Sequence, residues 1–156
     1  MDDLDATLIH LLAEHPRVGV LEASRRLGVA RGTVQARLNK LTESGVITGW
    51  GPDLDPEALG YPVTAFLTLE ISQATSDQGG HGGHEAVADH LAAIPEVLEA
   101  FTITGAGDMW CRVVARSNND LQRVIDAVLS GVGIVRSSTV IALAKQVPYR
   151  VRPLVR

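Results

Sequence analysis

The sequence predicts an α+β fold in which three short helices precede a four-stranded antiparallel sheet carrying two further helices. Over the first 44 residues, apolar side chains recur three or four positions apart, as in Leu4, Leu8, Leu11 and Leu12, which is helical spacing. After Pro62 the period shortens to two, which is typical of a strand with one buried face. With 156 residues and 46% hydrophobic content, the chain can build the cores of two small domains.

The first 50 residues predict a helix-turn-helix. The first helix opens on an acidic turn, as a helix N-terminus favours, and ends near Pro16. The second covers 20–27 and is closed by Gly28, and the third runs from about 30 to 44 before Gly45. A three-residue break between the last two helices is typical of the motif.

The segment that follows leads out of this unit. VITGW at its start is predicted to form a short strand, which would make residues 1–50 winged-helix-like. Residues 51–62 are rich in Gly and Pro and are predicted to be a linker.

Residues 63–147 predict a ferredoxin-like sandwich with the order β-α-β-β-α-β. The predicted elements are a strand over 63–71, a Gly-rich loop over 73–83, a helix over 84–94, strands over 97–104 and 108–116 joined by a GAGD turn, a helix over 118–129 and a strand over 134–147. Two helices would cover one face of the sheet and leave the other open. A second subunit is the expected cover, so this domain is predicted to dimerise. A basic tail over 148–156 completes the chain.

Charge is strongly segregated along the sequence, although the net charge is only −4 and the pI about 5.7. Residues 51–111 contain ten acids and no lysine or arginine, and residues 136–156 contain five bases and no acid. No acid lies between 23 and 42, a stretch whose cations are Arg25, Arg26, Arg31, Arg37 and Lys40. Attraction to phosphate acts over roughly 8 Å at physiological salt, so this local positive charge matters more than the total.

The predicted third helix has a face suited to the major groove of DNA. Val34, Leu38 and Leu41 share one side of the helix and are expected to pack inward. Amides that suit adenine edges and small residues that allow close approach lie opposite, flanked by groups for phosphates. The residues expected to bind DNA are Arg31, Gly32, Thr33, Gln35, Ala36, Arg37, Asn39 and Lys40. The competing interpretation is a solvated amphipathic helix with ordinary surface cations.

Four stretches, in this order, carry a resemblance to a known family. They are MDDLDATLIHLLAEHPR at the N-terminus, LGVARGTVQARLNKLTESGVITGW over 27–50, TGAGDMW over 104–110 and GIVRSSTVIALAK over 133–145. They resemble the first helix, the recognition helix with its GVI strand, the G-x-x-D turn and the R-[ST]-x-T strand of the Lrp/AsnC (feast/famine) bacterial transcriptional regulators. The resemblance spans nearly the whole chain and implies sequence-specific DNA binding.

The resemblance also implies an effector, an amino acid in many members, bound between subunits near the turn and the last strand. Carried over by position, the expected effector residues are Gly105, Ala106, Gly107, Asp108, Ser137 and Thr139. Glycine N–H groups suit a carboxylate, and Asp108 suits an ammonium. The alternative is a plain turn that needs glycine for positive φ, with an Asp that caps backbone.

The sequence departs from the family at four positions. Ala30 stands where a Ser opens the recognition helix, and Gly19 where a Ser or Thr caps the second helix. Gly107 and Met109 replace aromatic residues around the turn, which predicts a wider pocket and an effector with a larger or apolar side chain.

These observations predict a cytoplasmic regulator that binds double-stranded DNA as a homodimer and assembles further to a tetramer or octamer. No run of about 18 apolar residues predicts a membrane span, and no cofactor or metal is expected, because His81 and His84 have no third ligand nearby. The lone Cys111 lies in an apolar alternation and is expected to be a buried thiol.

Two other function classes stay open on the sequence. Some proteins that resemble this family are tetrapyrrole decarboxylases, which use His and Arg, and the chain has five histidines. Against this, residues 51–111 offer no cation for a charged substrate. The other class is a metabolite-binding assembly factor that does not bind DNA.

Overall fold

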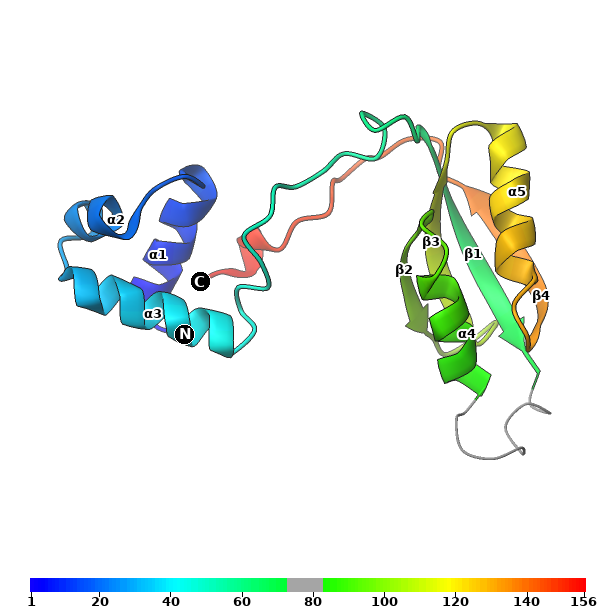
Figure 1. The fold of residues 1–156 in the computed structure, drawn as a ribbon, viewed down its shortest axis with the longest axis horizontal. Helices are drawn as coiled ribbons and strands as arrows, with labels where there is room; N and C mark the ends of the chain where they lie inside the picture. Colours follow the sequence, from blue (N-terminus) through cyan, green and yellow to red (C-terminus); the bar gives the residue numbers. More distant parts are fainter. Residues whose placement is uncertain (73–82) are drawn as a thin grey trace. The chain divides into compact units, whose positions relative to one another are not determined.

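The computed structural model describes residues 1–72 and 83–156, in two units. The first unit consists of residues 1–53 together with 146–156, and the second of residues 54–145 (Figure 1). The Gly-rich loop predicted over 73–83 lies, apart from Gly83, outside the described residues. No helix in the described ranges is long and apolar enough to cross a membrane.

The first unit contains the three predicted helices, α1 (Asp3–Glu14), α2 (Val20–Leu27) and α3 (Arg31–Glu43). Asp2 caps α1: its side chain accepts from the Asp5 N–H, and the Asp5 side chain accepts in return from the Asp2 N–H. Gly28 ends α2 with a φ of 66°. Apolar side chains from all three helices form the core, with Leu8, Ala23, Val34 and Leu41 at its centre.

The short strand predicted for VITGW is wrong. No strand is assigned between α3 and the first strand of the sheet, and the chain leaves α3 through a turn in which the Ile47 N–H donates to the Leu41 carbonyl. A strand needs a neighbouring strand to satisfy its backbone groups, and the described residues of this unit offer none.

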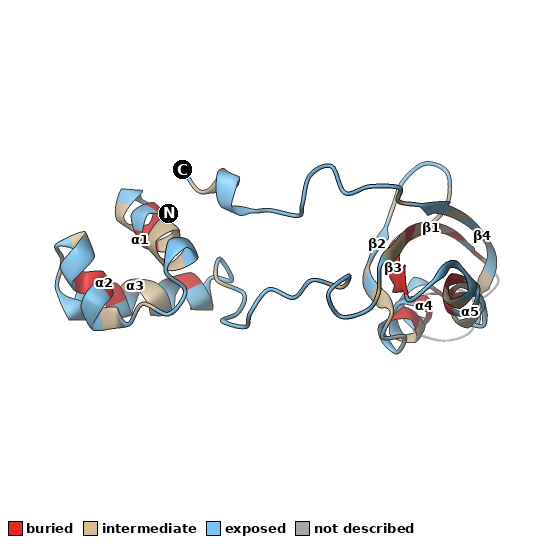
Figure 2. Cartoon of the chain, turned by 90° about the horizontal axis from the view of Figure 1, so that it is seen from above, coloured by how far each residue is buried: buried red, intermediate tan, exposed pale blue. Residues whose placement is uncertain are grey.

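The second unit is a four-stranded antiparallel sheet with two helices. Its elements are β1 (Val63–Ile71), α4 (Gly83–Ala92), β2 (Val97–Thr102), β3 (Met109–Ala115), α5 (Asn118–Leu129) and β4 (Ile134–Ile141), and the strand order is β2-β3-β1-β4. Figure 2 shows both helices on one face, with buried residues between them and the sheet. The predicted ferredoxin-like arrangement is therefore confirmed.

The last strand is shorter than predicted, because it ends at Ile141 and not at 147. Its partner β1 begins at Val63, directly after Pro62, and the final bond of the pair joins the Ala142 N–H to the Thr64 carbonyl. Beyond that point β1 has ended, and Pro62 before it has no N–H to donate to a longer β4.

The sheet buries the one cysteine of the chain. Cys111 has no exposed surface, and burial raises the pKa of its thiol to about 11. The predicted buried thiol is confirmed, and the thiolate form is disfavoured at neutral pH.

Aromatic side chains gather on the sheet face that α4 and α5 do not cover. Trp110 stacks on Phe66, with ring centroids 5.2 Å apart, and lies 5.9 Å from the ring of Phe101. Phe101 is 52% exposed. Val140 faces Phe66 across the β1–β4 pair and is also exposed. These four residues form an apolar patch, called the aromatic patch below.

Candidate DNA interface and effector site

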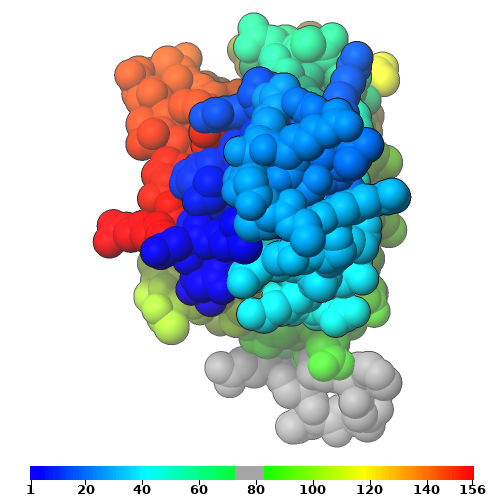
Figure 3. Space-filling view, turned by 90° about the vertical axis from the view of Figure 1, so that its left-hand side faces the viewer, coloured from blue at the N-terminus to red at the C-terminus, as the bar shows by residue number. Residues whose placement is uncertain are grey.

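The outer face of α3 is exposed, as the sequence predicts. Val34 and Leu41 are buried in the core, whereas seven of the eight residues expected to bind DNA are exposed: Arg31, Gly32, Thr33, Gln35, Ala36, Asn39 and Lys40. In Figure 3 the three helices, coloured blue to cyan, face the viewer. Among the described residues, neither Arg31 nor Lys40 has an ion-pair partner within 4.0 Å, so both cations are available to an anion.

The two amides of this face are bonded to each other. The Gln35 Nε2–H donates to Asn39 Oδ1 at 2.9 Å, across one turn of the helix. Gln35 and Asn39 also line a hollow of about 440 Å³, whose other lining residues are Leu38, Thr42, Glu43 and Trp50. The sequence analysis did not include Thr42, Glu43 and Trp50 in this surface. Glu43 could have been predicted, because it lies four residues after Asn39 and so on the same side of the helix.

Arg37 is the one residue of the eight that is not exposed, because its guanidinium is engaged within the unit and is not free for a phosphate in the way the sequence predicts. Its Nη1 donates to Asp2 Oδ2 at 2.5 Å and to Asp5 Oδ1 at 2.7 Å, so the guanidinium connects α3 to the start of α1. Asp5 is 1% exposed and needs a cation in its surroundings. Arg37 therefore acts within the unit as a structural link.

The protonation equilibria follow from this contact. The hydrogen bond from Arg37, with the nearby backbone N–H of Asp5, lowers the pKa of Asp2 to about 2, and the same guanidinium lowers the pKa of Asp5 despite its burial. The two carboxylates raise the pKa of Arg37. All three groups are charged at neutral pH.

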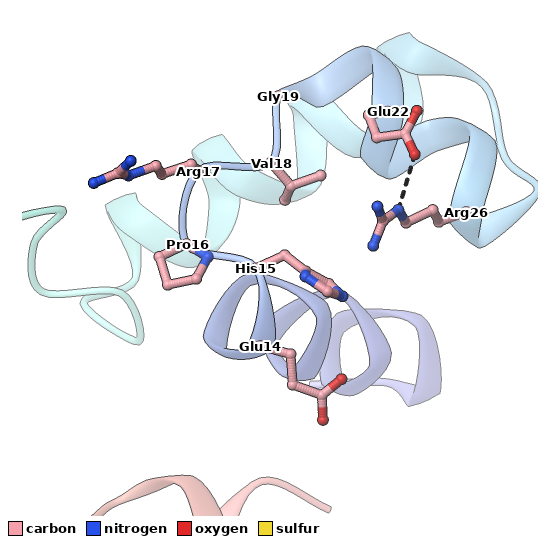
Figure 4. Close-up of a pocket in the computed structure, with 8 residues that line it drawn as sticks. All are labelled: Glu14, His15, Pro16, Arg17, Val18, Gly19, Glu22 and Arg26. Carbon is pink, nitrogen blue, oxygen red and sulfur yellow. Dashed lines mark hydrogen bonds and ion pairs between the residues drawn. The ribbon is translucent and has the colours of Figure 1, made fainter.

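A second hollow, of about 540 Å³, lies between the end of α1 and the start of α2 (Figure 4). It is lined by Glu14, His15, Pro16, Arg17, Val18, Gly19, Glu22 and Arg26. The charged groups partly cancel here, because Arg26 Nε donates to Glu22 Oε1 at 2.9 Å. Gly19 gives α2 no side-chain cap, in agreement with the departure noted in the sequence.

The basic tail is bound within the first unit. Arg152, in a short 3-10 helix over Arg152–Leu154, pairs through Nη2 with Glu14 Oε1 at 2.5 Å, and its Nε donates to His10 Nδ1 at 3.4 Å. The tail therefore contacts α1, and one of its cations is already paired.

The GAGD turn depends on its glycines. Gly105 has a φ of 103° and Gly107 a φ of 99°, conformations that L side chains rarely adopt. A Cβ on Gly107 would lie 2.4 Å from Thr68 Cγ2 and 3.2 Å from the Leu69 carbonyl oxygen, whereas a Cβ on Gly105 would meet nothing within 4 Å. Of the two glycines, only Gly107 is thus packed against β1.

Gly107→Ala is expected to destabilise the sheet unit more than Gly105→Ala. Both replacements carry the backbone strain of about 1–3 kcal/mol, but only Gly107→Ala adds a collision with Thr68. Thermal unfolding of the two variants, compared with the unaltered chain, measures the difference. Equal losses would show that the contact with Thr68 relaxes without cost.

Asp108 holds the turn to β1. Its Oδ2 accepts from the Ile71 N–H at 2.7 Å, and its own N–H donates to the Leu69 carbonyl at 2.8 Å. The alternative in which Asp108 caps a backbone group therefore describes a contact that is present. The capped group is the N–H of Ile71, which lies on β1 and not in the turn itself. One carboxylate oxygen is engaged in this contact.

The strand β4 brings Ser137 to the same end of the sheet. Leu69 faces Ser137 on one side and Met109 on the other, and Thr139 faces Leu67 two residues further along. Since Leu67 and Leu69 point into the core, half-buried Ser137 and Thr139 share the face covered by helices. Asp108 and Ser137 thus both lie beside β1 at Leu69, whereas Thr139 lies two residues further along β4, opposite Leu67.

The expectation that Met109 widens an effector pocket stays a prediction, and within the single chain its side chain is buried. Met109 is 3% exposed and belongs to the core between the sheet and its helices, because it faces Leu69. Gly105 and Ala106 are exposed. Within a single chain the turn is therefore an open surface, on which a ligand could contact the glycine N–H groups.

Comparison with known proteins places both units in one family. The model of the AsnC-type helix-turn-helix domain matches residues 1–42, and that of the Lrp/AsnC ligand binding domain matches residues 64–151. The HTH-type transcriptional regulator FL11 of Pyrococcus horikoshii is 32% identical over 143 residues, which cover 92% of this chain and 89% of that protein.

Solved structures agree with this assignment. The structure of Escherichia coli AsnC superimposes with a TM-score of 0.85 and 27% identity, covering 98% of this chain and 99% of that one. A transcriptional regulator of Neisseria meningitidis, NMB0573, solved as a complex with L-Met, shares the fold with a TM-score of 0.79 at 24% identity, over 96% of this chain and 93% of that one. From its two matched domains and its relatives, the chain belongs to the Lrp/AsnC family of DNA-binding, effector-responsive transcriptional regulators.

Proposed function

We propose that this chain binds double-stranded DNA as a homodimer through the outer face of α3, with Arg31 and Lys40 on phosphates and Gln35 and Asn39 on base edges. The exposure of this face, with both cations unpaired in the described chain, is the observation that carries the proposal. One such helix makes only a few base contacts, each worth about 1–3 kcal/mol, so useful specificity needs two copies on one site.

Lys40→Ala is expected to weaken binding to all DNA sequences alike and to reduce the slope of log K against log salt by about 1. Fluorescence anisotropy on the upstream region of its own gene and on a random duplex, at several salt concentrations, measures both quantities. Glu57→Ala, a charge change in the linker, is the control and should leave the slope unaltered. A complete lack of binding by the unaltered chain would contradict the proposed function.

The aromatic patch supports dimerisation. Phe66, Phe101, Trp110 and Val140 lie on the sheet face without a covering helix, and aromatic side chains are enriched in subunit interfaces. A second copy of the sheet unit would remove this patch from water. Dimers that associate further would form the tetramer or octamer expected from the sequence.

The proposed effector is an amino acid bound near the GAGD turn, where a second subunit would have to complete the enclosure. The positive-φ glycines support a carboxylate contact, Asp108 retains one carboxylate oxygen for an ammonium group, and Ser137 lies at the same end of the sheet. The L-Met complex of the Neisseria meningitidis relative favours this ligand class. Calorimetric titration of the unaltered chain and of Ser137→Ala with each amino acid tests the assignment.

The decarboxylase alternative gains no support from the described residues. His90 Nε2 lies 2.9 Å from the Ala127 carbonyl and 3.1 Å from the Val128 carbonyl at the end of α5, which occupies that histidine structurally. His81 lies outside the described residues.

A further inference from the structure

The two amides of α3 are a coupled pair, and this coupling bears on which bases they can read. Gln35 and Asn39 are both exposed, four residues apart, and joined by the Nε2–H to Oδ1 bond of 2.9 Å. Within the described part of the chain, this is the one side-chain hydrogen bond that either amide makes. Each amide therefore directs the orientation of the other.

The bond leaves the two amides with different free groups. A carboxamide has one carbonyl oxygen and two N–H donors. Gln35 spends one donor and keeps its oxygen and its second N–H, whereas Asn39 has its oxygen engaged and keeps two donors. Seen from the DNA, Gln35 presents an acceptor beside a donor, and Asn39 presents mainly donors.

These free groups match different base edges in the major groove. Adenine offers a donor and an acceptor side by side, which Gln35 complements. Guanine, thymine and adenine each offer an acceptor to the Asn39 donors, but cytosine offers only an N–H donor. Cytosine opposite Asn39 would set donor against donor and leave both without a partner in a site from which water is excluded.

We propose that Gln35 and Asn39 read neighbouring bases as one unit: Gln35 selects adenine, and the Gln35 bond makes Asn39 reject cytosine. This inference rests on the proposed DNA-binding function and deepens it. In water, helical pairs of this spacing favour the bonded arrangement only about twofold. Inside the groove the bonded arrangement of Gln35 and Asn39 is favoured more strongly, because an amide group that loses this bond has no water molecule to replace it.

The coupling has a consequence that independent contacts would not have. Gln35→Ala removes the adenine preference at its own position and also frees the Asn39 oxygen. Asn39 then presents an acceptor beside a donor and should select adenine at the neighbouring position, by roughly 5-fold or more over the other bases. A substitution at one residue thus alters the base preference at the position read by the other.

Selection of bound duplexes from a randomised library by the full chain, followed by sequencing, measures these preferences. The variants are Gln35→Ala, Asn39→Ala and Asn39→Asp. Asp at 39 keeps an acceptor for Gln35 but loses the donors, so it should reverse the exclusion and favour cytosine. Thr42→Asp adds the same charge in the same hollow and is the matched control, which should lower affinity without altering base preference.

Three outcomes separate the hypotheses. A new adenine preference at the Asn39 position in Gln35→Ala, with cytosine selected by Asn39→Asp, supports the coupled pair. If Gln35→Ala alters its own position only, the coupling is overturned while DNA binding stands. If the unaltered chain enriches no sequence, the proposed function fails and the coupled reading fails with it. Because Gln35 and Asn39 are both exposed, none of the three substitutions at these residues removes a core contact.

Discussion

Arg37→Gln is expected to destabilise the helix-turn-helix unit while leaving the sheet unit folded. The replacement leaves Asp5, which is 1% exposed, without its cation, and breaks the link between α3 and α1. We expect the unfolding midpoint of this unit to fall by roughly 5 °C or more. Hydrogen exchange measured by mass spectrometry resolves the two units, and only amides of the first unit, residues 1–53 and 146–156, should lose protection.

Lys40→Gln is the matched control, since it removes a cation from the same helix at an exposed position with no ion pair among the described residues. It should leave exchange protection unchanged. Equal effects of the two substitutions would mean that Arg37 contributes only as a general surface charge.

The same ion pairs set an acid limit. The pKa values of Asp2 and Asp5 are lower in the folded chain than the ordinary value near 3.8, so their contribution to stability is fully present above about pH 4. It is lost as the pH falls from there towards the folded pKa of Asp2, about 2. In Arg37→Gln this part of the acid dependence should shrink, because the largest cause of the lowered pKa values is lost and the backbone N–H bonds between Asp2 and Asp5 remain.

Trp110→Glu is expected to convert the proposed dimer to a monomer. The ring lies between Phe66 and Phe101 in the aromatic patch, and a carboxylate there would have to be buried without a partner when two sheets meet. Light scattering during size-exclusion chromatography should give a mass near the 16.6 kDa of one chain. Affinity for a two-half-site duplex should fall at least about 100-fold, because the helices are no longer linked.

Leu129→Glu supplies the control for this change. Leu129 is an exposed apolar residue at the end of α5, on the side of the sheet that the helices cover. The Leu129→Glu variant should remain dimeric. A monomeric Leu129→Glu, or a dimeric Trp110→Glu, would place the interface elsewhere.

Much of the fold is predictable because local chemistry sets it. Helix ends follow from Gly28, from the aspartates at the start of α1 and from the glycine after α3, and the sheet follows from the alternation after Pro62. The end of β4 could not be predicted in this way, since alternation continues in sequence beyond the point at which β1 can pair with it.

Site residues could be predicted where their position on the helix sets their exposure. They could not be predicted where residues distant in sequence come into contact. A helical wheel places Gln35 and Asn39 outward, and both are exposed. It also places Arg37 beside them, but Arg37 bonds to aspartates 32 and 35 residues away in sequence. Helical periodicity carries no information on such long-range pairs. The assignment of the turn residues to an effector stays a prediction.

The buried thiol of Cys111 gives the protein a practical advantage for spectroscopy. With no exposed surface and a pKa near 11, it will not compete for maleimide or iodoacetamide reagents while the sheet unit stays folded. A cysteine engineered on an exposed position of α3 can therefore carry a single fluorophore or spin probe in the otherwise natural chain. The rate at which Cys111 itself reacts then measures how often the sheet unit opens.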